Sequence, residues 1–122
     1  MMELGGRSLK DYVYFRHHLE EKETCFFLSQ LLTGVDYCHK RRLIHRDLKL
    51  ENIVFSRDPP YTLKIIDFGI AGLAAHDHGH LCTVRYAAPE MVASSSCAAD
   101  SKLDVWSMGV ILFRCLFGCF PF

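Results

Sequence analysis

The 122-residue chain is predicted to fold as a mainly α-helical unit that carries one small β hairpin. Two observations favour the helices: apolar residues recur at helical spacing between residues 21 and 42, and an almost wholly apolar run spans residues 105–122. A third favours the hairpin, because β-prone runs at 53–55 and 63–66 flank a segment that contains two prolines. The expected order is therefore helix, helix, hairpin, helix.

The first part of the chain is expected to hold a strand end, a turn and a short helix. Residues 1–6 are apolar and then glycine-rich, which is typical of a strand that ends in a tight turn. Ser8 and Asp11 have the spacing of a helix-capping pair, so a short helix should run from there to about Phe15. The charged residues 16–23 are interpreted as a solvated connection.

The second helix is predicted from about Glu21 to Arg42. Its apolar stripe consists of Phe27, Leu31, Val35 and Cys38. The basic residues 40–42 fall in its last turn, where cations complement the helix dipole. We interpret this basic run as a helix end rather than as a binding patch.

The apolar C-terminal segment is predicted to be a buried helix from Asp100 to about Phe117 that ends at Gly118. The run 105–122 contains Arg114 and is shorter than the about 20 apolar residues that a membrane-spanning helix needs. A helix that is apolar on all sides is typical of the interior of a larger domain. No membrane partner is therefore expected.

Composition argues against several classes of partner. Lys plus Arg and Asp plus Glu both number 14, so the formal net charge is zero, which argues against nucleic acid or an anionic membrane bound through bulk charge. The six cysteines form no C-x-x-C pair and are interpreted as reduced thiols. We expect a cytoplasmic protein, with the nucleus as the alternative.

The stretch from His45 to Asn52 places a carboxylate, a cation and an amide in one short loop, and Asp67 follows fifteen residues later. Phosphoryl transfer needs a carboxylate that receives a hydroxyl proton, a cation near the moving phosphate and oxygen ligands for Mg²⁺. The two β-prone runs lie between Asn52 and Asp67, so the hairpin should bring these oxygen donors together.

With Asp67-Phe68-Gly69 and Ala88-Pro89-Glu90, this loop makes the chain resemble the eukaryotic protein-kinase family, whose signatures are H-R-D-L-x-x-x-N, D-F-G and A-P-E. Lys49 marks the serine/threonine type. The segments YCHKRRLIHRDLKLEN, YAAPE and DVWSMGVILF are similar to the calcium/calmodulin-dependent and AMP-activated-like group. The resemblance implies a protein-kinase-like fold, of which this chain would be a mainly α large-lobe segment. It also implies ATP and Mg²⁺ as cofactors, a protein substrate and a regulatory protein partner.

The resemblance assigns the chemistry to four residues. Asp47 would be the catalytic base that accepts or orients the substrate hydroxyl, and Lys49 would neutralise the γ-phosphate in the transition state. Asn52 and Asp67 would bind Mg²⁺ through hard oxygen donors.

Five further positions would contact the nucleotide, the substrate or the catalytic residues by the same resemblance. Val54 would touch the adenine ring, and Glu3 and Gly5 would offer hinge backbone groups to it. Thr83 would contact the catalytic Asp and Lys, and Glu51 would bind a basic residue of the substrate peptide.

The remaining family positions would support the site. His45 and Phe68 would belong to a hydrophobic stack, and Asp104 would accept hydrogen bonds from the catalytic-loop backbone. Arg46 corresponds to the arginine that pairs with an activating phosphate in many relatives, and Glu90 to a glutamate that pairs with an arginine.

The segment before Thr83 departs from the family pattern. Residues 70–82 contain no Ser, Thr or Tyr, so no activating phosphorylation is expected there. His76, His78 and His80 alternate within it, which is compatible with a metal site or with a gain of charge at acid pH, but a polar loop is the preferred interpretation.

The domain prediction is a partial kinase domain over residues 1–122, from the hinge to the central helix of the large lobe. It would lack the small N-terminal lobe with its glycine-rich loop, strand lysine and C-helix, and the C-terminal large-lobe helices. Because those parts position the nucleotide, the isolated chain is expected to be inactive. Two alternatives remain open: a truncated kinase-like binding or scaffold protein without catalysis, and a non-functional gene fragment.

Overall fold

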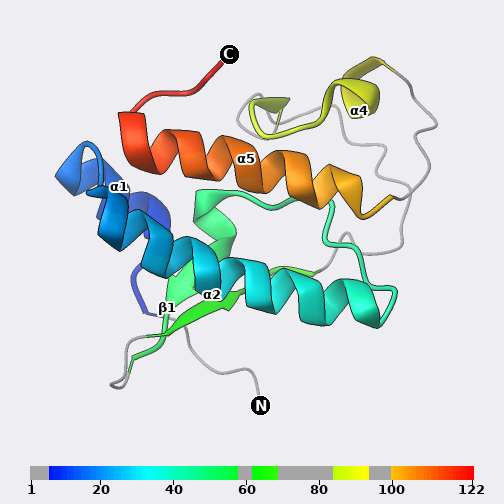
Figure 1. Ribbon diagram of the computed structural model, residues 1–122, viewed down its shortest axis with the longest axis horizontal. Coiled ribbons are helices and arrows are strands. Elements are labelled where there is room, and N and C mark those ends of the chain that lie inside the picture. The colour runs from blue at the N-terminus through cyan, green and yellow to red at the C-terminus, as the bar shows by residue number, and fades with distance from the viewer. Residues whose placement is uncertain (1–5, 58–61, 69–83, 94–99) are drawn as a thin grey trace.

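Two long helices, α2 (Glu21–Lys40) and α5 (Lys102–Phe117), pack side by side and form the main body of the structure (Figure 1). The computed structural model describes residues 6–57, 62–68, 84–93 and 100–122. The other elements are α1 (Leu9–Arg16), the 3₁₀ turn η1 (Leu50–Asn52), strands β1 (Ile53–Phe55) and β2 (Leu63–Ile65), and α4 (Pro89–Ala93). The predicted order of helices and hairpin is therefore present.

Helix α1 begins at the predicted capping pair. The Ser8 hydroxyl oxygen accepts a hydrogen bond from the Asp11 backbone N–H at 3.1 Å, and the hydroxyl donates to the Asp11 carboxylate at 2.8 Å. Leu9 and Val13, one helical turn apart, are each 1% exposed and anchor the helix in the core. The prediction of a short helix after Ser8 is confirmed.

The connection between α1 and α2 is shorter and better anchored than the sequence suggested. Leu19 is buried within it, and its backbone N–H donates a hydrogen bond of 2.7 Å to the carbonyl oxygen of Cys115 at the end of α5. Helix α2 begins at Glu21, as predicted for that helix, so the connection consists of residues 17–20 only. The prediction that this connection is solvated is wrong at Leu19. A single apolar residue among charged neighbours is enough to pin this segment to the core.

Helix α2 buries the predicted stripe. Phe27, Leu31 and Val35 are buried, Cys38 is half-buried, and Thr24 extends the stripe toward the start of the helix. The helix ends at Lys40, two residues before the predicted end, and Arg42 has a φ of 59°, which no α-helical residue adopts.

The hairpin pairs β1 with β2 in antiparallel register, with Ile53 opposite Ile65 and Phe55 opposite Leu63. Residues 6–8 run along the other edge of β1, where the Phe55 N–H donates to Arg7 O at 3.0 Å. Of the predicted strand end at 1–6, residues 1–5 lie outside the described residues. The predicted hairpin is confirmed.

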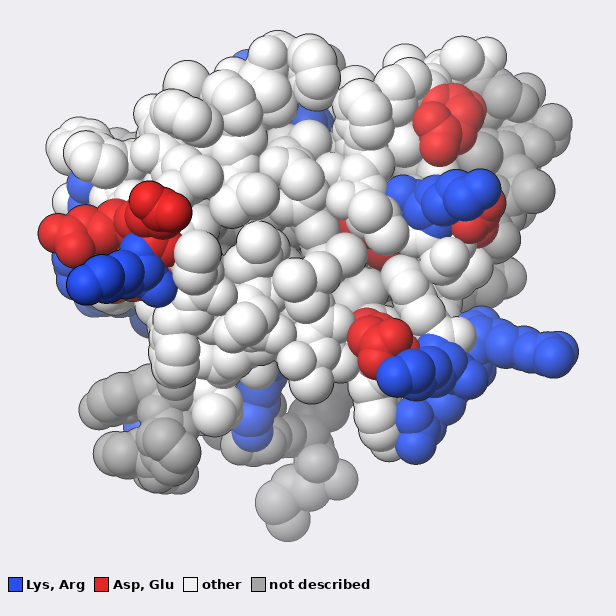
Figure 2. All heavy atoms as spheres, viewed as in Figure 1, with Lys and Arg blue, Asp and Glu red and all other residues white. Residues whose placement is uncertain are grey.

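Helix α5 packs on one side of the core and leaves the other side uncovered. Leu103, Val110 and Ile111 are buried, whereas Val105 and Phe117 are 56% and 64% exposed. Figure 2 shows a broad area without charged side chains between charged groups at its margins. Among the described residues, no helix is both long and apolar enough to cross a membrane.

The core joins all of these elements. Side chains from α1, α2, β1 and α5 contribute to one cluster of buried apolar residues, together with Leu48 and Leu50 on either side of Lys49. Cys115 belongs to this cluster, and burial raises the pKa of its thiol to about 11, so it packs as an unreactive apolar side chain at neutral pH. The cysteines of the described segments, Cys25, Cys38, Cys115 and Cys119, are free thiols.

We predict that Gly118→Ala lowers the free energy of unfolding by about 1–3 kcal/mol, because residue 118 has a left-handed backbone that penalises a side chain. A Cβ atom there would also clash with the carbonyl oxygen of His17. Urea unfolding followed by circular dichroism measures this loss. The matched control is Gly109→Ala within α5, where a Cβ meets nothing within 4 Å. In this control the free energy of unfolding should rise by about 1 kcal/mol, because alanine favours the helix more than glycine does. Equal effects of the two substitutions would contradict the prediction.

Candidate active site

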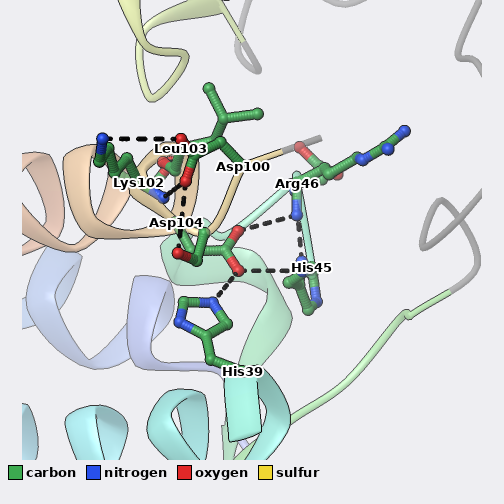
Figure 3. Close-up of polar contacts among 10 residues, drawn as sticks. His39, His45, Arg46, Asp100, Lys102, Leu103 and Asp104 are labelled. Atoms are coloured by element: carbon green, nitrogen blue, oxygen red, sulfur yellow. Dashed lines mark hydrogen bonds and ion pairs between the residues drawn. The ribbon is translucent and has the colours of Figure 1, made fainter. Parts of the chain in front are cut away.

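The backbone of the predicted catalytic loop is held by Asp104, in the first turn of α5. Its carboxylate accepts hydrogen bonds from the backbone N–H groups of His45, at 3.0 Å, and Arg46, at 2.8 Å (Figure 3). It also contacts the ring nitrogen Nε2 of His39, from the last turn of α2, at 2.7 Å. The Asp104 side chain is 1% exposed, so these three contacts replace the water that a carboxylate normally binds.

Arg46 shows why this anchor is needed. Its φ is 67°, in the left-handed region that residues other than glycine adopt at a cost of about 1–3 kcal/mol. The bond from its N–H to Asp104 Oδ1 compensates for part of that strain. The turn before Asp47 thus depends on a carboxylate from a distant helix.

The ring of His45 connects the loop to the end of β2. Its Nδ1 accepts a hydrogen bond from the Asp47 N–H at 3.2 Å, and its Nε2 lies 3.0 Å from the carbonyl oxygen of Ile66. Since a carbonyl oxygen only accepts, the proton must be on Nε2 and the ring is in its neutral form. The Phe68 ring packs edge-on against the imidazole, with centroids 4.8 Å apart.

Asp47 is buried, and its two carboxylate oxygens have different surroundings. Oδ2 accepts hydrogen bonds from Lys49 Nζ at 2.7 Å and from the Asn52 side-chain amide at 3.4 Å. The same Asn52 amide donates to the Asp47 carbonyl oxygen at 2.9 Å. Oδ1, in contrast, is buried and has no hydrogen-bond partner among the described residues. One oxygen is thus fixed by hydrogen bonds, and the other keeps its capacity to accept one.

The hairpin brings the two predicted Mg²⁺ ligands to one end of the sheet. The Ile66 N–H donates to the Asn52 carbonyl oxygen at 2.9 Å, so Asp67 follows directly after a residue that is paired with Asn52. Asp67 is exposed and has a φ of 63°. Within the described segments, no group of three or more His, Cys, Asp or Glu could hold a metal ion. Two oxygen donors fit Mg²⁺, because this ion usually keeps several waters and binds substrate phosphates as well.

The other predicted site residues lie around this centre or outside the described residues. Val54 is buried in the middle of β1, and Glu90 is exposed in the first turn of α4. Glu51 is half-buried and forms an ion pair of 3.2 Å with Lys10 of α1. Outside the described residues are Glu3, Gly5, Thr83, His76, His78 and His80.

Sequence reasoning missed two residues that position the site. His39 was given no role, and its one signal was its place just before the catalytic loop. Ser107 donates from its hydroxyl to the Tyr86 carbonyl oxygen at 2.9 Å, which links α5 to the segment before α4. Tyr86 is itself buried, and burial raises the pKa of its phenol.

We predict that Asp104→Asn lowers the free energy of unfolding by about 2–4 kcal/mol, because an amide nitrogen cannot accept the hydrogen bonds that a buried carboxylate oxygen accepts. Urea unfolding measures this loss, and hydrogen exchange should show faster exchange at the His45 and Arg46 amides. The matched control is Asp36→Asn, which removes an exposed ion pair with Lys40. The control should change stability by less than about 0.5 kcal/mol. Unchanged exchange in Asp104→Asn would contradict the anchoring role.

Comparison with known proteins identifies the family. The model of the protein kinase domain matches residues 1–122. A carbon catabolite-derepressing protein kinase of Secale cereale is 40% identical over 119 residues, which cover 94% of this chain and 23% of that protein. The protein of the same name from Candida tropicalis is 39% identical over 126 residues, covering 100% of this chain and 20% of that protein. A serine/threonine protein kinase of Oryza sativa subsp. indica is 41% identical over 119 residues, which cover 94% of this chain and 23% of that protein.

The chain therefore spans about a fifth of the length of these curated relatives. Their names and the match to the family model confirm the predicted resemblance, including its serine/threonine type and its kinase-like fold. Because the family model covers the whole chain, the chain belongs to the protein kinase family.

Proposed function

We propose that this chain is the part of an ATP-dependent serine/threonine kinase that receives the substrate hydroxyl and binds Mg²⁺. The observation that carries the proposal is the asymmetric environment of Asp47. One of its oxygens is held by Lys49 and Asn52, and the other is buried and has no hydrogen-bond partner among the described residues. Once a substrate hydroxyl reaches this second oxygen, the carboxylate can orient the hydroxyl and accept its proton.

Lys49 supplies the positive charge beside this carboxylate. Its ammonium group lies 2.7 Å from Asp47 Oδ2 and is 20% exposed, so it can turn toward a phosphate group without leaving the site. The positive charge of Lys49, placed beside Asp47, would stabilise the negative charge that develops on the transferred phosphoryl group. Asn52 keeps the Asp47 backbone in place through its amide.

Asn52 and Asp67 are the residues that would hold Mg²⁺. Both carry oxygen donors, and the hairpin register keeps their backbones adjacent. When bound, Mg²⁺ would neutralise charge on the β- and γ-phosphates of ATP. His45 supports this arrangement, because its ring connects the Asp47 backbone to Ile66, the neighbour of Asp67.

A non-catalytic, partner-binding function is the second candidate, and one observation favours it. Five exposed large apolar residues lie on the two long helices: Phe26, Leu32, Tyr37, Val105 and Phe117. The face of the molecule drawn in Figure 2 also has a broad uncharged area. Apolar areas of this kind are typical of surfaces that contact other protein.

The catalytic proposal is tested by a segment exchange. Residues 1–122 replace the matching segment of the Secale cereale kinase, and transfer from Mg-ATP to a serine peptide is measured. We predict that Asp47→Asn lowers the rate of this chimera by about 10²- to 10⁴-fold, the usual effect of losing a general base. Asp36→Asn, an exposed change of the same type, should leave the rate unchanged. An active chimera whose rate survives Asp47→Asn would disprove the role of Asp47.

For the 122-residue chain alone we predict no phosphoryl transfer above the level of its own Asp47→Asn variant. The sequence contains no G-x-G-x-x-G phosphate loop, and phosphate positioning carries most of the catalysis in this reaction. Radiolabelled ATP with a serine peptide measures transfer. A shift in melting temperature with Mg-ATP reports whether the nucleotide still binds. Transfer that depends on Mg²⁺ and Asp47 would refute this prediction.

A further inference from the structure

A cavity of about 120 Å³ lies next to the candidate active site, between α1, η1, residues 85–86 and the end of α5. Its walls include the apolar side chains of Val13, Leu50 and Phe120. The volume is far larger than the roughly 10–15 Å³ that one water molecule requires. Leu50 belongs to η1, which begins directly after Lys49. The cavity therefore borders the loop that carries Asp47.

The charges around this cavity are mainly positive. Lys10, Arg85 and Arg114 line it together with one carboxylate, that of Glu51. Lys10 is already paired with Glu51, with 3.2 Å between its Nζ and Glu51 Oε1. Among the described residues, neither guanidinium forms an ion pair with a carboxylate. Within the described part of the chain, the cavity thus has two cations without a counter-charge.

Both of these cations contact the ring of Phe120. The guanidinium carbons of Arg85 and Arg114 lie 5.1 and 5.5 Å from its centroid. An aromatic face attracts a cation but does not neutralise its charge. In addition, Nη1 of Arg114 is buried and has no hydrogen-bond partner in the part of the chain that the structure describes. A buried charged donor without an acceptor is unfavourable, so the site favours a ligand that supplies one.

We propose that this cavity binds an acidic side chain, Glu or Asp, of the protein substrate. Its carboxylate accepts hydrogen bonds from Nη1 of Arg114 and from the Arg85 guanidinium, the group that best matches a carboxylate in geometry. The apolar walls exclude water and strengthen this attraction. Glu51 Oε2 is also buried and has no hydrogen-bond partner among the described residues, and it accepts an N–H of the same peptide. This inference rests on the proposed kinase function, because it names the substrate class of that site.

The proposal differs from the role that the family resemblance gives to Glu51, which is to bind a basic substrate residue. Here the charge of Glu51 is compensated by Lys10 of the same chain. A basic substrate residue that entered the cavity would face Arg85 and Arg114. Like charges at such short range disfavour that ligand, so the two arginines reverse the preference that Glu51 alone would give.

The test measures peptide binding to the 122-residue chain by fluorescence anisotropy. The peptides contain one serine and are identical except at a single position, which carries Glu, Gln or Lys and is moved through each place within five residues of the serine. At one position the Glu peptide should bind about tenfold more tightly than the Lys peptide, as expected for one added charge-assisted contact. Gln should be intermediate.

Three variants test the assignment. Arg85→Glu and Arg114→Glu should each abolish or reverse the preference for Glu. Arg85 is exposed, so its variant stays informative even if Arg114→Glu unfolds, which thermal unfolding detects. Lys22→Glu makes the same change in charge at an exposed position of α2 and should leave the preference unchanged.

The proposal is overturned by a preference for Lys, by no preference at any position, by a preference that survives Arg85→Glu, or by no binding of any of these peptides. Binding does not require phosphoryl transfer, so the two proposals can fail separately. An active chimera without a Glu preference would contradict only the acidic specificity. A Glu preference that reverses in Arg85→Glu, together with an inactive chimera, would contradict only the kinase function.

Discussion

The carboxylate of Asp104 is the constraint on which the site geometry depends. It joins the end of α2, the backbone before Asp47 and the first turn of α5, through contacts of 2.7 to 3.0 Å. Without it, the left-handed backbone of Arg46 would have no compensating interaction among the described residues. The rigid part of the site is therefore a junction between helices, and the loop takes its shape from that junction.

Much of the fold could be predicted because local chemistry determines it. The Ser8–Asp11 pair, the apolar stripe of α2 and Gly118 each carry a signal within a few residues, and all three are present in the structure. Periodicity does not specify where a helix ends, so the prediction missed the left-handed turn at Arg42. The burial of Leu19 was not predicted, because a single apolar residue among charged neighbours forms no periodic pattern.

The residues of the candidate site that belong to a sequence motif could be predicted, whereas those from distant parts of the chain could not. Asp47, Lys49, Asn52 and Asp67 were found through a motif, and the hairpin spacing explained why Asn52 and the residue before Asp67 meet. His39, Arg85 and Arg114 were not singled out for the site, because their neighbours come from distant parts of the chain. A charged residue in the sequence does not reveal whether an oppositely charged partner will lie beside it in the fold. Lys10 and Glu51 form an ion pair with one another. Arg85 and Arg114 form no ion pair with a carboxylate among the described residues.

The contacts of Asp104 also have a consequence for how the site forms during synthesis. They join residues separated by 58 to 65 positions along the chain, so none of them can exist before residue 104 has been made. Non-local contacts of this kind form late, after the local helices. The segment from His45 to Asn52 therefore carries its chemical groups well before it can hold them in position. Its geometry is established only when α5 docks.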